Sequence, residues 1–150
     1  MEIRITKGNP ADRDIVARFQ VEMAEESEGT SLNVEVVRKG VEAVLLDPSK
    51  GTYYLARNEK DEIMGSLLVT KEWSDWNNCD YWWIESVYVS PQYRGQKVFS
   101  TLYSEVRRLA REAGANSLRL YVDRHNLRAQ STYKKFGMDE CHYLMYEENL

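Results

Sequence analysis

The sequence predicts a single α/β domain over residues 1–150, in which one mixed β-sheet is flanked by helices. Three observations predict this class. The chain has 150 residues, of which 43% are hydrophobic, and this suits one ordinary globular domain. No internal repeat or linker-like stretch divides the chain. The spacing of apolar residues changes repeatedly between the period of a strand and that of a helix, which gives the order β-α-α-β-β-β-α-β-α-β.

The first third of the chain reads as one short strand and two helices. Apolar residues alternate with charged ones at residues 2–6, which predicts a strand. Asn9-Pro10 is a helix-start signal, and apolar residues keep helical spacing from there to about Glu26. After a polar loop, a second helix is predicted from Val34 to the stop signal at Asp47-Pro48.

Three strands are predicted in the middle of the chain. Residues 52–57 and 63–70 form a hairpin around a charged turn. Residues 71–80 are predicted to be a long polar and aromatic connection. The near-continuous apolar and aromatic run at 81–89 is typical of a central strand, and it stops at Ser90-Pro91.

The last third alternates helices with strands. Apolar residues over 98–110 share one helix face, and Gly114 is an end signal for that helix. Residues 118–122 alternate as a strand. A short helix is capped by Asn126 and ends before Gly137, and residues 141–147 are predicted to form the final strand.

Charge is unevenly distributed along the chain. The formal net charge is −4 at pH 7, which argues against a dedicated nucleic-acid-binding protein. Between Arg94 and Lys135, however, ten basic residues accompany only three acidic ones. This segment therefore carries +7 and the remainder −11. A basic segment in an acidic protein suggests a small polyanionic ligand.

Cysteine and histidine usage excludes other classes. Cys79, Cys141 and two histidines, with no CxxC motif, provide neither a disulfide framework nor a metal site. No apolar run approaches the ~20 residues that cross a bilayer, and the first residues lack the apolar core of a signal peptide. We therefore expect a cytoplasmic protein without a metal, a nucleic-acid partner or a membrane partner.

The first motif that carries chemistry is a strand followed by Pro91, Arg94-Gly95 and an amphipathic helix. A helix N-terminus presents unpaired N–H groups, and glycine lets the backbone approach an anion. Arg94 and Lys97 add two cations. In physical terms this is a phosphate cradle, although its spacing is neither a Walker nor a Rossmann pattern. Taken alone, it also suits an ordinary strand-to-helix turn.

The second motif runs from Asn126 to Gly137. Asn126, Ala129 and Tyr133 lie at spacings of 0, +3 and +7, so they share one helix face. The small Ala129 lets another group pack there. Taken alone, this motif also suits a capped helix with a core tyrosine.

In this order and separation, the two motifs resemble the GNAT superfamily of acetyl-CoA-dependent N-acyltransferases. Val87-Tyr88-Val89 and the stretch from Ser90 to Phe99 look like the superfamily's fourth strand and acyl-CoA loop. The stretch from Asn126 to Gly137 looks like its second motif. The resemblance spans essentially the whole chain and is sharpest over Trp83–Met138.

The resemblance implies acetyl-CoA as co-substrate. The backbone of Val87-Tyr88-Val89 would pair with the pantetheine arm as a false strand. Asn126, beside Ala129, would contact the pantetheine or phosphate end, and Tyr133 would lie by the thioester sulfur. The loop residues that would hold the pyrophosphate are Arg94, Gly95, Gln96, Lys97, Val98, Phe99 and Ser100.

The loop departs from the superfamily pattern Q/R-x-x-G-x-G/A at two positions. Lys97 stands where the first glycine is usual, and Phe99 stands where the second small residue is usual. Lys97 can still offer its N–H, provided that its φ is negative. Phe99 either crowds the phosphate path or turns into the core.

The resemblance also implies direct attack of an amine on the acetyl thioester, with no acyl-enzyme. Backbone amides around Tyr88 would stabilise the oxyanion. Tyr133 would donate a hydrogen bond or a proton to the leaving thiolate.

Glu85 is the candidate base that accepts the proton of the amine. The period of a strand places it on the same face as Trp83, Val87 and Val89. An acid in so apolar a run needs a partner or a function. A structural ion pair or hydrogen bond at Glu85, and a water relay in place of a protein base, all remain open.

The acceptor pocket of the superfamily usually lies between the first two helices and the loop before the fourth strand. Acids and aromatics in those segments suit a cationic amine through charge pairing and cation–π contact. The candidate residues are Glu25, Glu26, Trp73, Trp76 and Trp83. A solvated helix end and core tryptophans are the structural alternative.

The function predicted from these residues is acetylation of a primary amine on a small molecule or a protein. The alternative, favoured by Lys97 and Phe99, is a non-catalytic acyl-CoA-binding or interaction module on a degenerate GNAT scaffold. A homodimer is compatible with the resemblance, because many superfamily members pair.

Overall fold

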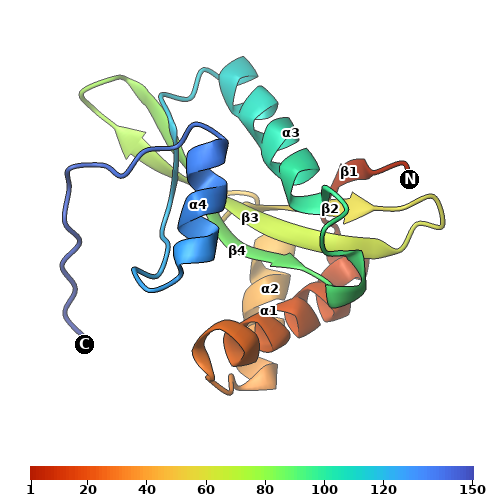
Figure 1. Cartoon of the computed structure of the whole chain (residues 1–150). Coiled ribbons are helices and arrows are strands. Elements are labelled where there is room, and N and C mark those ends of the chain that lie inside the picture. Colours follow the sequence, from red (N-terminus) through yellow and green to blue (C-terminus); the bar gives the residue numbers. More distant parts are fainter. The chain divides into compact units, whose positions relative to one another are not determined.

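The computed structural model describes all 150 residues, and the chain divides into two compact units, Met1–Leu120 and Tyr121–Leu150. The first unit contains a five-stranded sheet and three helices, and the second contains one helix (Figure 1). No helix of the chain combines the length and apolarity that a bilayer crossing requires.

The sheet has the order β1-β2-β3-β4-β5, antiparallel from β1 to β4 and parallel between β4 and β5. The predicted α/β class with a mixed sheet flanked by helices is therefore confirmed. The strands are β1 (Arg4–Lys7), β2 (Thr52–Arg57), β3 (Ile63–Ser74), β4 (Cys79–Val89) and β5 (Leu118–Leu120). The helices are α1 (Arg13–Glu28), α2 (Val34–Leu46), α3 (Val98–Glu112) and α4 (Leu127–Lys135), with 3-10 turns η1 (Pro10–Asp12) and η2 (Pro91–Tyr93).

Local capping fixes where the first two helices begin. Asn9 and Asp12 form a reciprocal capping box at η1, directly before α1. The Asn33 side chain accepts from the Val36 N–H, 3.1 Å away, at the start of α2. Helix α1 ends at Gly29, whose φ of 61° suits a residue without a Cβ.

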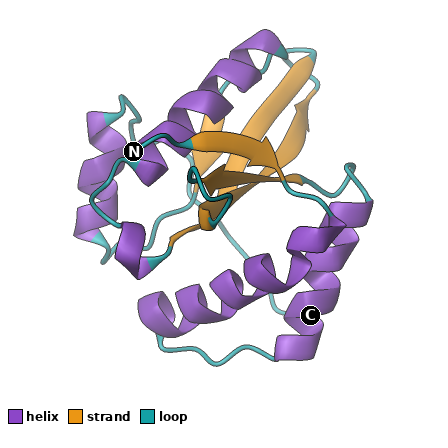
Figure 2. Cartoon of the chain, turned by 90° about the vertical axis from the view of Figure 1, so that its right-hand side faces the viewer, coloured by secondary structure: helices purple, strands orange, loops and turns teal.

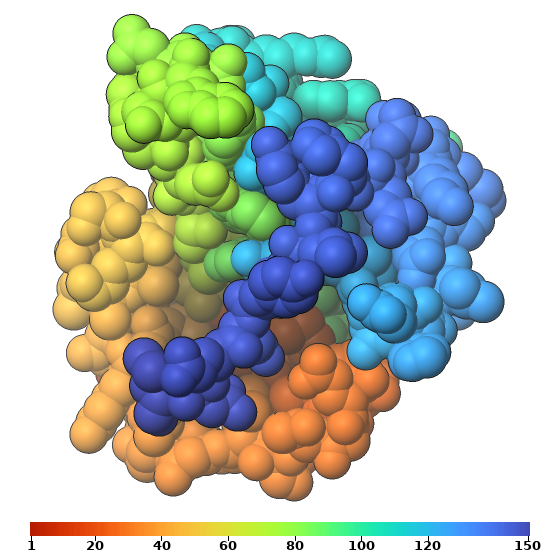
Figure 3. Space-filling model, turned by 90° about the vertical axis from the view of Figure 1, so that its left-hand side faces the viewer, coloured from red at the N-terminus to blue at the C-terminus, as the bar shows by residue number.

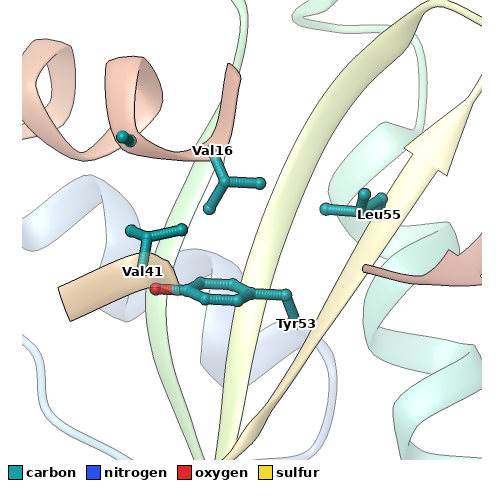
Figure 4. Close-up of a cluster of buried hydrophobic side chains, with 5 residues drawn as sticks. Val16, Val41, Tyr53 and Leu55 are labelled. Atoms are coloured by element: carbon teal, nitrogen blue, oxygen red, sulfur yellow. The ribbon is translucent and has the colours of Figure 1, made fainter. Parts of the chain in front are cut away.

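Helices pack against both faces of the sheet in the first unit (Figure 2). Val16 of α1 and Val41 of α2 lie against Tyr53 and Leu55 of β2 in a buried cluster (Figure 4). Because side chains alternate along a strand, Tyr54 and Ala56 point to the other face, which α3 covers. We call these the α1–α2 face and the α3 face.

The predicted connection at residues 71–80 is wrong. Strand β3 continues to Ser74, and β4 begins at Cys79, so only a short turn separates them. The register pairs Glu72 with Tyr81 and Trp73 with Asp80. This end of the hairpin is largely exposed on both faces, so its residues lack the alternation that marks a half-buried strand.

The two C-terminal strand predictions also need correction. Strand β5 ends at Leu120 rather than at residue 122, and residues 141–147 form no strand. Tyr143, Leu144 and Tyr146 are exposed instead. A β-propensity signal needs a partner ladder to become a strand, and the unit Tyr121–Leu150 contains none. The single-domain assignment of residues 1–150 stays a prediction.

Candidate active site

A β-bulge in β4 organises the backbone near the end of that strand. Leu68 pairs with Glu85 and Ser66 pairs with Tyr88, so β4 has one more residue than β3 between these two pairs. Ser86 lies within this stretch with a φ of 52°, in the left-handed region that most residues avoid. The small polar Ser86 inside an apolar run is the sequence signal that could have revealed the bulge.

The bulge reverses which face each following residue presents. Glu85 and Tyr88 share the α1–α2 face, as their partners Leu68 and Ser66 do. The expectation that Glu85 shares a face with Val87 and Val89 is therefore wrong. Simple alternation fails there because the bulge at Ser86 adds one residue to the strand, and one extra residue reverses the face of every residue after it.

The same reversal turns backbone amides toward an open edge. Before the bulge, the Trp82 N–H donates toward β5, to the Ser117 carbonyl at 2.9 Å. After the bulge, the Ser90 N–H donates toward β3, to the Met64 carbonyl at 2.9 Å. By alternation, the N–H groups of Val87 and Val89 point away from β3. Since β5 pairs only with Trp82–Ile84, these amides lie on an edge with no partner strand in Met1–Leu120.

The loop after β4 presents further unpaired N–H groups. Gly95 has a φ of 75° and open space where a Cβ would stand. The first hydrogen bond of α3 runs from the Thr101 N–H to the Lys97 carbonyl, 3.0 Å apart. The amides of residues 98–100 therefore have no acceptor within the helix, and no side chain caps them. An anion at this helix start would meet N–H groups and the positive end of the helix dipole.

Arg94 is engaged with α1 rather than with the start of α3. Its guanidinium forms an ion pair with Glu26, with atoms 2.6 Å apart, and its Nε donates to the Val89 carbonyl at 2.9 Å. It also lies over the Tyr88 ring, 5.5 Å from the centroid. The hydrogen bond from Arg94 lowers the pKa of Glu26, so this carboxylate is charged at neutral pH.

Tyr88 makes a second link to α1. Its hydroxyl donates to Glu22 at 2.9 Å, and its ring lies 5.1 Å from that of Phe19. Burial, together with the Glu22 carboxylate, raises the pKa of Tyr88 to about 12, so the hydroxyl keeps its proton at neutral pH. Sequence reasoning assigned Tyr88 only a backbone role.

An open pocket of about 570 Å³ lies beside these links. Three carboxylates of α1 line it together with Tyr88 and the η2 turn, so the structure brings Glu25 and Glu26 to one site. Its lining residues are Arg18, Glu22, Glu25, Glu26, Tyr88, Ser90, Pro91 and Gln92.

The tryptophans lie at the other end of the sheet. Trp73 pairs with Asp80, which precedes Tyr88 by eight residues, or roughly 26 Å along the strand. Trp73 and Trp76 are exposed, at 61% and 89%. In Figure 3 the lime-green hairpin and the orange end of α1 lie at opposite ends of the visible face. The acids and these two tryptophans therefore do not form one cluster.

Trp83 belongs to a polar aromatic group that the sequence did not reveal. Its Nε1 donates to Glu72 at 2.9 Å, and Glu72 lies 3.7 Å from a guanidinium nitrogen of Arg119. That guanidinium stacks 3.7 Å from the centroid of Tyr81. We call Glu72, Tyr81, Trp83 and Arg119 the hairpin cluster. Its members come from three neighbouring strands, so only the register brings them together.

Glu85 is half-buried on the α1–α2 face. Its charge contributes, after burial, to raising the pKa of Tyr53 to about 12, which places the two side chains near each other. No basic side chain forms an ion pair with Glu85. The structural ion pair considered from the sequence is therefore not found.

The second unit holds the other sequence motif. Asn126 accepts a hydrogen bond from the Ala129 N–H at 3.1 Å and so caps α4. Tyr133 lies in the second turn of α4 and is half-buried, and burial raises its pKa. The shared face of Asn126, Ala129 and Tyr133 follows from the helix, while their contacts with a cofactor stay a prediction.

Comparison with known proteins decides the family. The model of the acetyltransferase (GNAT) family matches residues 17–138, about four fifths of the chain. This chain belongs to the GNAT acetyltransferase family. The resemblance carried by the two motifs is thus confirmed, and the predicted acyltransferase class and co-substrate, acetyl-CoA, are those of the family.

Three relatives give the extent of the similarity. A thialysine N-epsilon-acetyltransferase of Bos taurus is 33% identical over 78 residues, which cover 52% of this chain and 45% of the relative. A candidate ribosomal protein bS18-alanine N-acetyltransferase of Bacillus subtilis is 42% identical over 55 residues, or 37% and 36%. The chain thus aligns with less than half the length of these two relatives. A solved structure, a possible acetyltransferase from Clostridium difficile 630, is 36% identical with a TM-score of 0.94 and covers 100% of this chain and 99% of its own.

Lys97, which stands where the GNAT pattern usually has glycine, lies in the left-handed region that glycine adopts without strain. Its φ is 66°, so the condition stated from the sequence, a negative φ, is not met. The left-handed conformation costs a residue with a Cβ about 1–2 kcal/mol. The loop of this chain therefore holds a left-handed residue at an energetic cost, and the lysine adds a cation beside the helix start. Phe99 is half-buried, and its ring lies 6.1 Å from that of the buried Tyr103, one turn later in α3.

Proposed function

We propose that this chain is an N-acetyltransferase that moves the acetyl group of acetyl-CoA to a primary amine by direct attack. One observation carries the proposal. The β4 edge that the bulge opens leads directly to the unpaired amides at the start of α3, within a chain of the GNAT family. The exposed edge offers hydrogen bonds to an extended amide-containing arm, and the helix start suits the pyrophosphate that follows such an arm.

The residues present fit acetyl-CoA. The Val87 and Val89 amides lie on the open edge, the main chain at Gly95 leaves room for close approach, and Lys97 adds a positive charge. When bound, acetyl-CoA supplies an acetyl thioester that an amine can attack. An edge amide of β4 is the proposed donor to the developing oxyanion.

Tyr133 acts in this proposal as a hydrogen-bond donor to the leaving sulfur. Burial raises its pKa above the ordinary value of 10.0, so it is a weaker acid than a free tyrosine. A thiol of the cysteine type has a pKa of about 8.5. Complete proton transfer from Tyr133 to the thiolate is therefore uphill, whereas hydrogen bonding is not.

Glu85 is the proposed proton acceptor for the amine. It is half-buried, lies just before the bulge and has no ion-pair partner, so its carboxylate is available to a substrate amine or to a relaying water. Sharing a face with Tyr88 places it on the side of the sheet that carries the acidic pocket.

We propose that the acceptor is a cationic amine bound at the acidic pocket of α1. Glu22, Glu25 and Glu26 outnumber the one lining cation, Arg18, so the pocket favours positive charge. The names of the two curated relatives give thialysine and an alanine of ribosomal protein bS18 as acceptors. Both classes present an ammonium group, and both belong in the test.

Two measurements test the proposed function. A thermal-shift titration with acetyl-CoA should raise Tm in a concentration-dependent way. Release of free thiol should then depend on adding an amine from a panel of lysine analogues, polyamines and N-terminal peptides. Tyr133→Phe and Glu85→Gln should each lower kcat by roughly 100-fold or more without preventing the thermal shift.

The outcomes separate the enzyme from the binding module that the strained Lys97 favours. A thermal shift with no thiol release on any amine indicates the non-catalytic acyl-CoA-binding module. The absence of a shift at millimolar acetyl-CoA contradicts both functions. Full turnover by Tyr133→Phe removes the role assigned to that hydroxyl.

A further inference from the structure

The contacts of Arg94 are unexpected for a residue at the start of an anion-binding loop. Both guanidinium NH groups face the Glu26 carboxylate, at 2.6 Å and 2.9 Å, and Nε donates to the Val89 carbonyl. The guanidinium plane also lies over Tyr88. Three nitrogens of Arg94 are thus bound to α1 and to the end of β4.

This arrangement is more than a surface ion pair. The side chains of Arg94 and Glu26 are 43% and 50% exposed, and isolated pairs at such exposure contribute little. Here, however, the carboxylate contact is two-pronged, and the backbone bond with the aromatic ring fixes the guanidinium orientation. The Tyr88 hydroxyl repeats the connection one turn earlier, at Glu22. Two adjacent links therefore join the C-terminal half of α1 to the segment that leads into the loop.

The loop residues beyond Arg94 show the opposite behaviour. Gly95 and Lys97 are exposed, and no ion pair joins Lys97 to α1. The segment thus has two parts. Arg94 faces α1 and the acidic pocket, while the amides after it face solvent at the start of α3.

We propose that Arg94 and Glu26 form a strut that positions the acceptor pocket and couples it to the acyl-CoA loop, so that Arg94 serves the acceptor rather than the pyrophosphate. The proposal rests on the proposed function in placing the acceptor amine at the pocket. Arg94 is a positioning residue in this account. It holds the α1 turn that carries Glu22, Glu25 and Glu26, and it cancels the charge of Glu26, which leaves Glu25 as the carboxylate without a partner.

A set of matched variants tests the strut. Arg94→Gln and Glu26→Gln should each raise the KM of the acceptor by roughly 5- to 30-fold, with kcat at saturating acceptor and the Kd of acetyl-CoA each within about twofold of wild type. The double variant should be no worse than the poorer single variant, because both remove one interaction. Arg94→Lys, which keeps the charge but loses the two-pronged geometry, should lie between.

Two further variants serve as controls. Glu28→Gln makes the same charge change in the same last turn of α1, at a residue that forms no ion pair, and should leave the KM unchanged. Lys97→Gln should show the reverse pattern, with weaker acetyl-CoA binding and an unchanged acceptor KM. Hydrogen exchange of the amides at residues 22–29 adds a readout that needs no substrate, and it should accelerate in Arg94→Gln and Glu26→Gln alike.

Specific results would overturn the strut. If Arg94→Gln weakens acetyl-CoA binding tenfold or more while Glu26→Gln changes nothing, Arg94 is a phosphate ligand. Unchanged hydrogen exchange at residues 22–29 in both variants would also refute the proposal, whatever the kinetics. Failure of the proposed function has a different signature, since the wild-type chain itself would then bind no acetyl-CoA or release no thiol.

Discussion

The two ends of β4 differ in how their backbone hydrogen bonds are satisfied. At the hairpin end, Cys79 to Ile84 pair in regular register with β3, and β5 joins from the other side. Toward the loop, the strand contains a bulge, loses its β5 partner and leads to a lysine with positive φ. One end satisfies its hydrogen bonds within the sheet, and the other leaves them open.

The comparison indicates that regular strand pairing stabilises the fold, whereas irregular backbone leaves N–H groups available to a ligand. A regular ladder such as that beneath the hairpin cluster gains stability from cross-strand contacts. An open edge gains nothing from the sheet, but it exposes N–H groups to a ligand, and strained residues concentrate at such sites. We therefore expect variants at the loop end to change ligand binding, and variants at the hairpin end to change stability alone.

Gly65→Ala should have the largest effect. A Cβ at residue 65 would stand 2.8 Å from the Tyr88 carbonyl oxygen and 3.3 Å from the Val89 Cα, and both are backbone atoms of β4 that cannot rotate away. We expect a loss of about 2–3 kcal/mol in the free energy of unfolding, measured with urea. Because the clash displaces the open edge, acetyl-CoA affinity should also fall by at least tenfold.

Gly40→Ala is the matched control for this substitution. Residue 40 lies in α2 with nothing within 4 Å of an added Cβ. Replacing a helical glycine there should stabilise the protein by about 0.5–1 kcal/mol and leave affinity unchanged. If the two variants had the same unfolding free energy and acetyl-CoA affinity, the close approach of β4 at Gly65 would be contradicted.

Arg119→Gln tests the hairpin end. The variant removes a cation stacked on Tyr81 and an ion pair with Glu72, at a position that is 31% exposed. We expect a loss of about 1 kcal/mol in unfolding free energy, with acetyl-CoA affinity within twofold of wild type. A tenfold loss of acetyl-CoA affinity without loss of stability would contradict the proposed difference between the two ends of β4.

Lys97→Gly should separate strain from charge at the loop end. Glycine relieves the left-handed backbone, which costs about 1–2 kcal/mol for lysine, but it increases the entropy of the unfolded chain by part of that amount. A net gain of about 0.5 kcal/mol in unfolding free energy is expected. Acetyl-CoA affinity should nevertheless fall by a few-fold, since one cation is lost. If affinity rises instead, the lysine impedes the phosphates.

The regular parts of the molecule are those that the sequence predicts well. Strand β2 was predicted with its observed ends, 52–57, because a buried strand with clear turns on both sides has unambiguous periodicity. The hairpin from Lys71 to Asp80 was mistaken for a loop, since exposed strands lose that pattern. The final strand predicted at 141–147 failed because pairing partners cannot be read from local residues.

The candidate site shows the same limit. Val87 and Val89 were reached through the family resemblance, but the reason their amides are available, the bulge at Ser86, breaks the very alternation used to assign faces. The side-chain role of Arg94 was missed because its partner, Glu26, is 68 residues away. The two α1 acids and the tryptophans were grouped by composition, and the length of β4 separates them.

Acid should remove the stability that the Arg94–Glu26 strut contributes. The bond from Arg94 lowers the pKa of Glu26 below its ordinary value of 4.5, so the strut adds stability above that value and loses it as pH falls through the folded-state pKa. The stability difference between wild type and Glu26→Gln should be constant from pH 8 to about 5 and should shrink as the pH falls below 4.5. Urea unfolding of both proteins at each pH measures this small effect, to which Glu28→Gln provides a flat reference. A stability difference that does not shrink on acidification would mean that the carboxylate charge is not what joins α1 to the loop.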